Sequence, residues 1–308
     1  MQSAARREPA MPESIERVES AIEAMHNGEM VVILDAQDRE NEGDLCVAAE
    51  TVDADDVNFM AKHGRGLICL AMTGDRLDAL DIPMMVDEQE NTSSFGTAFT
   101  VSIEADEGVT TGISAADRAQ TIQVAVEDDA GPDDIVTPGH VFPLRARDGG
   151  VLVRTGQTEA SVDLARMAGL KPAAVICEVM NPDGTMARRP DLEEFSEEHD
   201  VQMLSVSDIV QYRLRTESLV ERIDRTELPT DHPGDWSVEV YRNQIDEVQH
   251  LAFVCGSPDP DEPVPVRVQH RCDTFDVFMR QTPETSTGQL GRVMEAIGRE
   301  GTGVVVYL

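Results

Sequence analysis

The sequence has 308 residues, with 59 acidic and 25 basic side chains and a formal net charge of −34. Such a charge repels nucleic acid and anionic membrane surfaces, so we expect the protein to bind neither. The length is sufficient for two domains, and a hydrophobic content of 41% with only 4% aromatic residues predicts an aliphatic core in an α/β or α+β protein.

The composition also indicates the compartment. Lys62 and Lys171 are the only lysines and acidic residues occur along the whole chain, which predicts a surface adapted to a high-salt cytoplasm. An acidic protein of ordinary salt conditions is the alternative. The five cysteines are widely spaced without a Cys-x-x-Cys pair, so we expect neither disulfides nor a zinc knuckle. Because no leader-like or membrane-spanning apolar run occurs, we expect a cytoplasmic protein.

Helical and extended patterns alternate from the first residues onward. Apolar side chains recur at helical spacing from Ile15 to Met25, and the pattern ends at Gly28, which predicts a capped helix. A strand over 30–34 follows, and the polar run 35–44 predicts a loop after it, where function is often located. The next predicted elements are a strand over 67–72, a short helix over 76–80 and a strand over 95–103.

The alternation continues to residue 216. Ser114 predicts the N-cap of a helix, with Asp117 completing a capping box. After it we predict a turn over 137–140, strands over 141–144 and 151–153, closure of the latter strand by 154–158, a helix over 159–168, a strand over 173–180 and a turn over 181–184. This order favours an α/β fold, an α+β layered sandwich.

The pattern changes after Tyr212, which predicts a second, smaller domain of mixed α/β type. The expected domains are residues 1–216 and 217–308. In the second we predict strands over 237–241, 250–255 and 304–308, a turn over 258–263 and a helix over 288–299.

Five acidic residues and Arg39 lie within the run 35–44. The acids are Asp35, Asp38, Glu40, Glu42 and Asp44. Carboxylates this close repel one another unless a cation lies among them, and hard divalent ions prefer such oxygen ligands. In a chain this acidic, a solvated surface loop is the alternative interpretation.

Further residues have types suited to chemistry. Glu178 interrupts the apolar run 173–180, where a buried carboxylate is costly without a function, and an edge position facing solvent is the alternative. His140 follows Pro-Gly in the predicted turn, an accessible position for acid/base work, although a single loop histidine is more often inert. Arg154–Thr158 and Thr110–Gly112 combine hydroxyl groups and small residues at helix starts, which bind phosphate or simply form caps.

In their order, these segments resemble the motifs of 3,4-dihydroxy-2-butanone 4-phosphate synthase. The matching segments are Asp-Arg-Glu-Asn-Glu-Gly-Asp-Leu (38–45), His-Gly-Arg-Gly-Leu-Ile-Cys-Leu (63–70), Gly-Val-Thr-Thr-Gly-Ile-Ser-Ala-Ala-Asp-Arg (108–118), Pro-Gly-His-Val-Phe-Pro-Leu-Arg-Ala (138–146) and Cys-Glu-Val-Met-Asn-Pro-Asp-Gly-Thr-Met-Ala-Arg (177–188). The resemblance covers residues 14–216. It implies an α/β sandwich and a homodimer that converts D-ribulose 5-phosphate to 3,4-dihydroxy-2-butanone 4-phosphate and formate in riboflavin biosynthesis, with Mg²⁺ or Mn²⁺.

The resemblance also implies roles for individual residues. His140 and Glu178 match residues needed for catalysis, and Glu40 matches a magnesium ligand. The residues that match substrate contacts are Arg39, Glu40, Asp44, Arg154, Thr155, Gly156, Gln157, Thr158 and Glu178. Those near the active site without a certain role are Asp35, Cys69, Thr110 and Thr111.

One residue departs from the family pattern. The family motif reads Arg-x-Gly-His-Thr and its histidine is the second protein ligand of the metal, whereas this chain has Gln157 there. The site is then expected to hold its ion through Glu40, waters, substrate oxygens and the amide oxygen of Gln157, with weaker affinity than a site that has the histidine.

The second domain resembles the start of GTP cyclohydrolase II. The similar residues are 250–254, 266–268, Cys272, 289–290 and 303–308. Of that family's three zinc cysteines only Cys272 is matched, so we expect no zinc, no GTP hydrolysis and a degenerate or structural domain. The same missing cysteines argue against an enzyme with both riboflavin activities.

A non-catalytic, dimeric sugar-phosphate-binding or regulatory paralogue is the alternative function. Gln157 and the degenerate second domain favour it. Retention of Glu40, Asp44, His140 and Glu178 argues against it.

Overall fold

The structure is a computed structural model that describes residues 13–259, 261–270 and 289–308. The chain divides into two compact units, Met1–Thr216 and Glu217–Leu308. Each unit has its own sheet and its own apolar core.

A seven-stranded mixed sheet forms the centre of the first unit, in the order β4-β5-β3-β6-β2-β1-β7. Its strands are β1 (Val31–Leu34), β2 (Gly43–Ala48), β3 (Cys69–Met72), β4 (Ile103–Ala105), β5 (Ile135–Arg145), β6 (Ala173–Glu178) and β7 (Gln202–Ser205). β1 pairs with β7, and β3 with β5, in parallel; the other neighbours are antiparallel.

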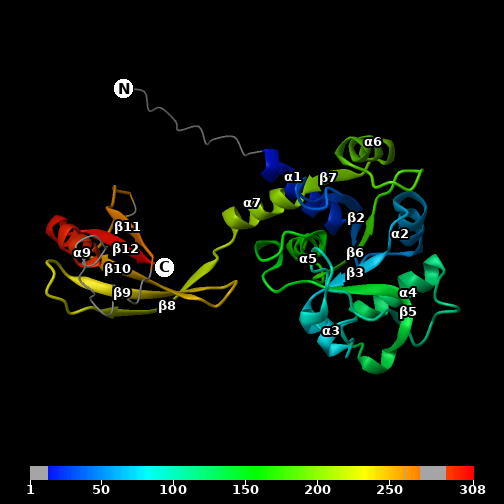
Figure 1. Ribbon diagram of the computed structural model, residues 1–308, viewed down its shortest axis with the longest axis horizontal. Helices are drawn as coiled ribbons and strands as arrows, with labels where there is room; N and C mark the ends of the chain where they lie inside the picture. The colour runs from blue at the N-terminus through cyan, green and yellow to red at the C-terminus, as the bar shows by residue number, and fades with distance from the viewer. Residues whose placement is uncertain (1–12, 260, 271–288) are drawn as a thin grey trace. The chain divides into compact units, whose positions relative to one another are not determined.

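Helices cover both faces of this sheet, so the unit is a three-layer sandwich (Figure 1). One face carries α1 (Glu13–His26), α5 (Gln157–Met167) and α7 (Val206–Thr216). The other carries α2 (Ala54–Phe59), α3 (Gly74–Ala79), α4 (Ala115–Val126) and α6 (Arg189–His199). The layered fold expected from the sequence is confirmed.

Successive residues of a central strand point into opposite cores. Val32 and Leu45 pack on the α2 side, whereas Val31 and Cys46 pack on the α5 side. Because both faces are covered, β1 and β2 are buried along their whole length. Such strands appear in the sequence as continuous apolar runs.

The sheet brings several strand ends to one edge. Leu34, the last residue of β1, pairs with Gly43, the first residue of β2. The next residue of β2, Asp44, lies opposite Glu178, the last residue of β6. The polar loop 35–42 therefore lies at the edge where β6 ends.

The segment 95–103, expected as a strand, is mostly irregular. Only Ile103 belongs to β4, whereas Phe99 and Thr100 each form an isolated bridge. Their backbone groups bond to different neighbours in turn: the Phe99 carbonyl accepts from Met85 and the Thr100 N–H donates to Pro143. The prediction was wrong because apolar alternation did not produce one continuous ladder.

The turn expected over 137–140 is part of the long strand β5. Gly139 donates its N–H to the carbonyl of Ser102 at 3.2 Å, and a Cβ at this position would collide with the carbonyl of Ile103. The pairing of β4 and β5 shifts register between Ile103 and Glu104. The glycine therefore serves a close approach of two strands, as at a bulge, rather than a turn.

The apolar triplet 151–153, expected as a strand, overlaps the 3₁₀ turn Gly150–Leu152. Gly149 and Gly150 have φ values of 85° and 62°, so the chain turns where a strand would have started. Gly156 is the N-cap of α5. Gln157 and Thr158 therefore lie in the first turn of a helix and not at a strand end.

Several elements were not predicted. They are β2, α2 with the π-helical turn Met60–Gly64 that follows it, α6, β7, α7 and, in the second unit, β8 (Val220–Glu227) and β11 (Val266–Gln269). Helix α6 illustrates the cause, since Leu192 is its one buried residue and a charged helix of this kind lacks a clear apolar stripe.

The second unit is a five-stranded sheet, β11-β12-β10-β9-β8, with helix α9 (Gln289–Glu300) packed on one face. Its other strands are β9 (Trp236–Asn243), β10 (Gln249–Cys255), β11 (Val266–Gln269) and β12 (Gly303–Tyr307). Three predicted strands and the predicted helix coincide with β9, β10, β12 and α9 to within a few residues. Cys272, the expected remnant of a zinc site, lies outside the described residues.

Candidate active site

The loop 35–42 is folded around the carboxylate of Asp35. One oxygen of this buried side chain accepts from the backbone N–H of Glu40 at 3.0 Å and from Arg39 Nη1 at 2.9 Å. The other oxygen accepts from the N–H of Glu42 at 2.9 Å. Asp35 therefore fixes the shape of the acidic loop, because charge-assisted bonds of this kind are strong.

Arg39 joins two candidate metal ligands. Its Nη2 lies 2.8 Å from Oε1 of Glu40, and its Nη1 donates to Oε1 of Gln157 at 3.1 Å. The Arg39 guanidinium also stacks on Phe95, with Cζ 5.0 Å from the ring centroid. The oxygens of Glu40 and Gln157 thus face one guanidinium, although Arg39 and Gln157 are 118 positions apart in the sequence.

Asp44 and Glu178 place two carboxyl groups side by side on β2 and β6. Asp44 is buried, and its Oδ1 has no hydrogen-bond partner among the described residues. Burial raises the pKa of Asp44 well above its usual range, and the charges of Glu178 and Glu40 raise it further. Such a group gains from protonation or from a neighbouring cation.

Glu178 is half-buried at the end of β6 rather than in the middle of a longer strand. Its Oε2 accepts from the backbone N–H of Leu67 at 2.8 Å. A Cβ at Gly66 would lie 2.5 Å from the same oxygen. The glycine before Leu67 therefore lets the backbone approach the carboxylate closely.

Cys69 lies near these carboxylates, in β3. Burial raises the pKa of its thiol, and the charges of Glu178 and Asp44 add to the effect. Burial likewise raises the pKa of Cys177 to about 12. Neither thiol is a nucleophile at neutral pH, because the thiolate is the reactive form.

Arg154 is engaged by protein groups. Its Nη1 donates to Oε2 of Glu159 at 2.5 Å, and Nε and Nη2 donate to the carbonyl of Phe95 at 3.3 and 3.2 Å. Thr155 and Gly156 follow it and lead into α5. Arg154 therefore ties the start of α5, including Gln157, to the residue that stacks on Arg39.

His140 forms a dyad with a carboxylate that sequence patterns did not reveal. Its Nδ1 lies 2.6 Å from Oε2 of Glu104, and Thr121 donates its hydroxyl to the other oxygen of Glu104 at 3.1 Å. Phe142 lies opposite Cys69 across β5 and β3. His140 precedes Phe142 by two residues on β5, so the dyad lies just beyond the part of β5 that pairs with β3.

Thr110 and Thr111 lie before α4, whose N-cap is Ser114 as predicted. The carboxylate of Asp117 accepts from the N–H and the hydroxyl of Thr110 at 3.0 and 2.7 Å and from the N–H of Gly112 at 3.0 Å. Hydrogen bonding, first of all from the Thr110 side chain, lowers the pKa of Asp117 to about 2. The backbone donors of this loop therefore bind Asp117, and Thr111 is exposed.

The oxygen groups of this edge fit a hard divalent ion. Across the described residues, no three His, Cys, Asp or Glu side chains are arranged to hold a metal. Mg²⁺ commonly takes one or two protein oxygens and completes its shell with water and substrate oxygens. Glu40 and Gln157, whose side-chain oxygens both face Arg39, match that requirement better than a closed protein cage.

Comparison with known proteins identifies the family. The sequence model of 3,4-dihydroxy-2-butanone 4-phosphate synthase matches residues 19–212. The chain belongs to this family. The model of GTP cyclohydrolase II matches residues 221–308.

Named relatives of the synthase family cover most of the chain. The riboflavin biosynthesis protein RibBA of Aquifex aeolicus is 52% identical over 293 residues, which are 94% of this chain and 71% of that protein. The 3,4-dihydroxy-2-butanone 4-phosphate synthase of Neisseria meningitidis serogroup A is 51% identical over 282 residues, which are 91% of this chain and 76% of that protein.

Solved structures of synthases agree with the fold. RibBX, a two-domain 3,4-dihydroxy-2-butanone 4-phosphate synthase from A. baumannii, is 42% identical with a TM-score of 0.74, over 95% of this chain and 81% of its own. A synthase in complex with two magnesium ions is 41% identical with a TM-score of 0.61, over 65% of this chain and 97% of its own.

The expected family is thereby confirmed, and with it the expected synthase function in riboflavin biosynthesis. Nothing in these comparisons favours the non-catalytic alternative. Across the described part of the chain, no helix is both long and apolar enough to cross a lipid bilayer.

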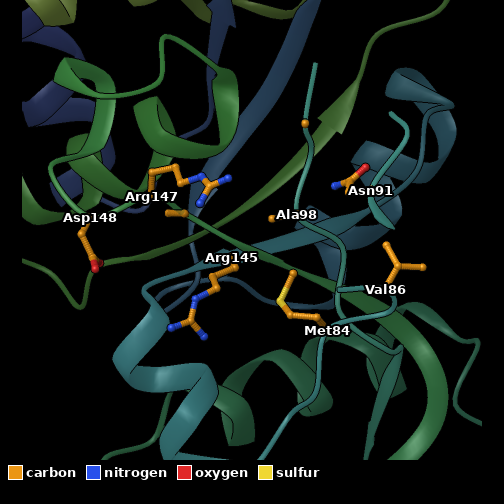
Figure 2. Close-up of a pocket in the computed structure, with 9 residues that line it drawn as sticks. Met84, Val86, Asn91, Ala98, Arg145, Arg147 and Asp148 are labelled. Atoms are coloured by element: carbon orange, nitrogen blue, oxygen red, sulfur yellow. The ribbon is translucent and has the colours of Figure 1, made fainter. Parts of the chain in front are cut away.

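The first unit also has a separate hollow of about 220 Å³. Figure 2 shows its lining, which includes Met84, Asn91, Arg145 and Arg147. Arg145 forms a bidentate ion pair with Asp78, at 2.6 and 2.9 Å. The hollow contains none of the residues expected at the active site.

Sequence reasoning missed Glu104, Phe95 and Glu159 as parts of the site. Glu104 lies in the alternating stretch Val-Ser-Ile-Glu-Ala (101–105), so it interrupts no apolar run as Glu178 does, and its signal was weaker. Phe95 and Glu159 carry no such signal. Their importance depends on contacts with Arg39 and Arg154 that only the fold creates.

Proposed function

We propose that the first unit converts D-ribulose 5-phosphate to 3,4-dihydroxy-2-butanone 4-phosphate and formate. Family membership supports the reaction. The observation that carries the proposal is the guanidinium of Arg39, which binds Glu40 and Gln157 at the edge where the buried Asp44 lies opposite Glu178. A sugar phosphate requires this combination of cationic, oxygen-binding and proton-transferring groups.

We infer that Mg²⁺ or Mn²⁺ serves this site and that zinc does not. A related synthase was solved with two magnesium ions. Glu40 and Gln157 are the residues that would hold the ion, and oxygen ligands suit hard cations. When bound, the ion supplies Lewis-acid stabilisation for the oxygens of an enediolate.

The protein residues then bind the substrate and transfer protons. Arg39 and Asp44 contact the sugar phosphate, and Thr155, Gly156 and Thr158 present the start of α5 to it, where N–H groups suit anionic oxygens. Arg154 supports this surface through Glu159 and Phe95.

His140 and Glu178 carry the proton transfers. Loss of the C3 proton of ribulose 5-phosphate gives the enediol, and later steps require protons to be returned. Because Nδ1 of His140 bonds to Glu104, Nε2 is the ring atom available to substrate. Glu104 thus holds the imidazole in one orientation.

We also propose a cytoplasmic homodimer. Leu67, Phe95, Ile113 and Val153 are large apolar side chains that are exposed in the single chain. Exposed apolar surface is typical of protein interfaces. Light scattering of the active protein should give twice the chain mass, and a monomer under the same conditions would exclude the dimer.

For the second unit we infer a structural or binding role without GTP cyclohydrolase II activity. Its sequence is related to that family. The support for inactivity is the cysteine pattern, because Cys272 alone matches a zinc ligand and one thiolate cannot form the site.

Formate release tests the proposed reaction. Purified protein is incubated with ribulose 5-phosphate and Mg²⁺ or Mn²⁺ across a range of salt concentrations, and formate is measured enzymatically. We expect formate in amounts equal to the dihydroxybutanone phosphate formed, and none in EDTA. Absence of formate with either metal at every salt concentration would leave the non-catalytic paralogue as the better interpretation.

A further inference from the structure

Arg188 connects the start of α6 to the acidic loop. Its Nη1 donates to the carbonyl oxygens of Glu40 at 2.7 Å and of Asn41 at 2.5 Å. The same guanidinium atom lies 3.8 Å from Oε1 of Glu42. Two consecutive backbone carbonyls of the loop thus converge on one cation.

The loop is held from two directions. On one side, the N–H groups of Glu40 and Glu42 donate to Asp35. On the other, the carbonyls of Glu40 and Asn41 accept from Arg188. Asn41 has a φ of 55°, in the left-handed region that a non-glycine residue adopts at a cost. This conformation persists because the surrounding contacts hold it.

Arg188 is itself fixed by packing and capping. Its backbone N–H donates to the carboxylate of Asp191 at 2.9 Å. Leu192, one turn into α6, is fully buried against Gly43, where a Cβ would lie 2.6 Å from a Leu192 methyl group. The first turn of α6 is therefore seated on the residue where the acidic loop enters β2.

We propose that Arg188 is a positioning residue that holds Glu40 in the orientation in which it binds the divalent ion. This rests on the proposed function, because it takes Glu40 as the ligand. We call the two bonds from Arg188 to the carbonyls of Glu40 and Asn41 the clamp. The clamp acts on the backbone of the metal ligand and does not contact the ion. Its loss should lower metal affinity by letting the loop leave the conformation around Asn41.

Charge alone predicts the opposite result. Arg188 is a cation near Glu42 and Glu40, so its removal makes the site more negative and should strengthen the binding of a divalent ion. The clamp predicts weaker binding. Arg189 provides the control for charge: its side chain is 57% exposed, and its ion pair is with Glu193 at 3.8 Å, on its own helix.

The experiment measures Mn²⁺ binding without substrate, by the electron paramagnetic resonance signal of free Mn²⁺. The full chain is compared as wild type, Arg188→Gln, Arg188→Lys and Arg189→Gln. We expect Arg188→Gln to raise the Kd about tenfold, a typical size for a group that orients a metal ligand. Arg188→Lys should raise it less, because an ammonium donates to the carbonyls without the planar fork. Arg189→Gln should leave the Kd unchanged or lower it.

Formate release provides a second readout. At saturating Mn²⁺, Arg188→Gln should regain a kcat within about twofold of the wild type, since a positioning role through the metal ligand affects the half-saturating metal concentration. A general structural defect would reduce kcat at every metal concentration. That result, if the folded fraction is unchanged, would overturn the proposal.

The binding data decide the proposal independently of the reaction. It is overturned if Arg188→Gln binds Mn²⁺ as tightly as Arg189→Gln, or if the wild type binds none. If Arg188→Gln does not fold, Arg188→Lys, which keeps the charge, decides alone: a Kd equal to that of the wild type overturns the clamp. Failure of the proposed reaction gives a different result: the wild type then binds Mn²⁺ but releases no formate.

Discussion

Asp44 and Asp35 are two buried aspartates of one site that should respond in opposite ways to the same substitution. Asp35 accepts hydrogen bonds from Glu40, Glu42 and Arg39. Asp44 instead has a buried oxygen without a partner among the described residues. In the absence of a divalent cation, Asp44→Asn should stabilise the first unit and Asp35→Asn should destabilise it.

The magnitudes follow from these contacts. A buried acceptor without a partner costs about 1–3 kcal/mol, which Asp44→Asn should recover in the free energy of unfolding. The introduced amide can donate to Glu178, which lies opposite on β6. Asp35→Asn removes the charge from three bonds and should cost roughly 1.5–3 kcal/mol. Each kcal/mol corresponds to about 2–4 °C in Tm for a unit of this size.

The effect at Asp44 should depend on pH in a defined direction. Burial, and then the charge of Glu178, raise the pKa of Asp44 in the folded state. The folded state therefore favours the protonated form, and the penalty for ionised Asp44 is complete above the folded pKa. It decreases as the pH falls through that value and disappears below the ordinary pKa of an aspartate. The gain from Asp44→Asn should shrink accordingly.

Differential scanning calorimetry in EDTA measures these differences, and the transition that Asp35→Asn lowers identifies the first unit. Asp44→Asn should raise the Tm of that transition at pH 8, and this gain should be lost on acidification. In a separate assay with metal, the same variant should release no formate. A Tm below that of the wild type at every pH, or a gain that does not change with pH, would refute the electrostatic reasoning.

Further outcomes concern activity, metal and salt. Formate release should disappear in Glu40→Ala, His140→Ala and Glu178→Gln. If the His140–Glu104 dyad carries general acid/base catalysis, Glu104→Gln should reduce kcat by about 10²-fold or more. Unchanged activity in Glu104→Gln would remove Glu104 from the mechanism. Gln157→His should lower the metal concentration for half-maximal activity and Gln157→Leu should raise it, whereas identical titrations would place Gln157 away from the ion. The second unit should hydrolyse no GTP, and stoichiometric zinc by elemental analysis would contradict this. Folding and activity should require high salt, because close carboxylates repel until screened; full activity at about 0.1 M salt, where the Debye length is still ~10 Å, would count against this.

The elements that were predicted correctly are those whose buried faces produce a regular pattern of apolar residues in the sequence. Helix α1 has one buried stripe, and the central strand β6 is buried on both faces, so each leaves a periodic or continuous apolar signal. The acidic run was visible as a polar loop after a strand, His140 as an accessible residue in a predicted turn, and Glu178 as a carboxylate within an apolar run. Their assignment to one active site came from the resemblance to the synthase family and not from the residue pattern.

The elements that sequence patterns missed depend on contacts between distant segments. Gly139 looked like a turn residue, but it allows β5 to pass close to Ile103. The triplet 151–153 is apolar enough for a strand, yet the positive φ values at Gly149 and Gly150 turn the chain into α5. Local pattern cannot distinguish these cases, because the deciding neighbour lies far away in the sequence.

Gln157 shows how a departure from a family motif acquires physical meaning only in the fold. Its amide oxygen already accepts from Arg39 at 3.1 Å, and a carbonyl oxygen has two lone pairs. One lone pair can therefore remain on the guanidinium while the other faces an ion. An imidazole offers one nitrogen at a time for either purpose, so glutamine can keep Arg39 and Glu40 in register with the metal position. We therefore expect glutamine to weaken metal binding without dismantling the site, because Arg39 retains its contacts with Asp35 and Glu40.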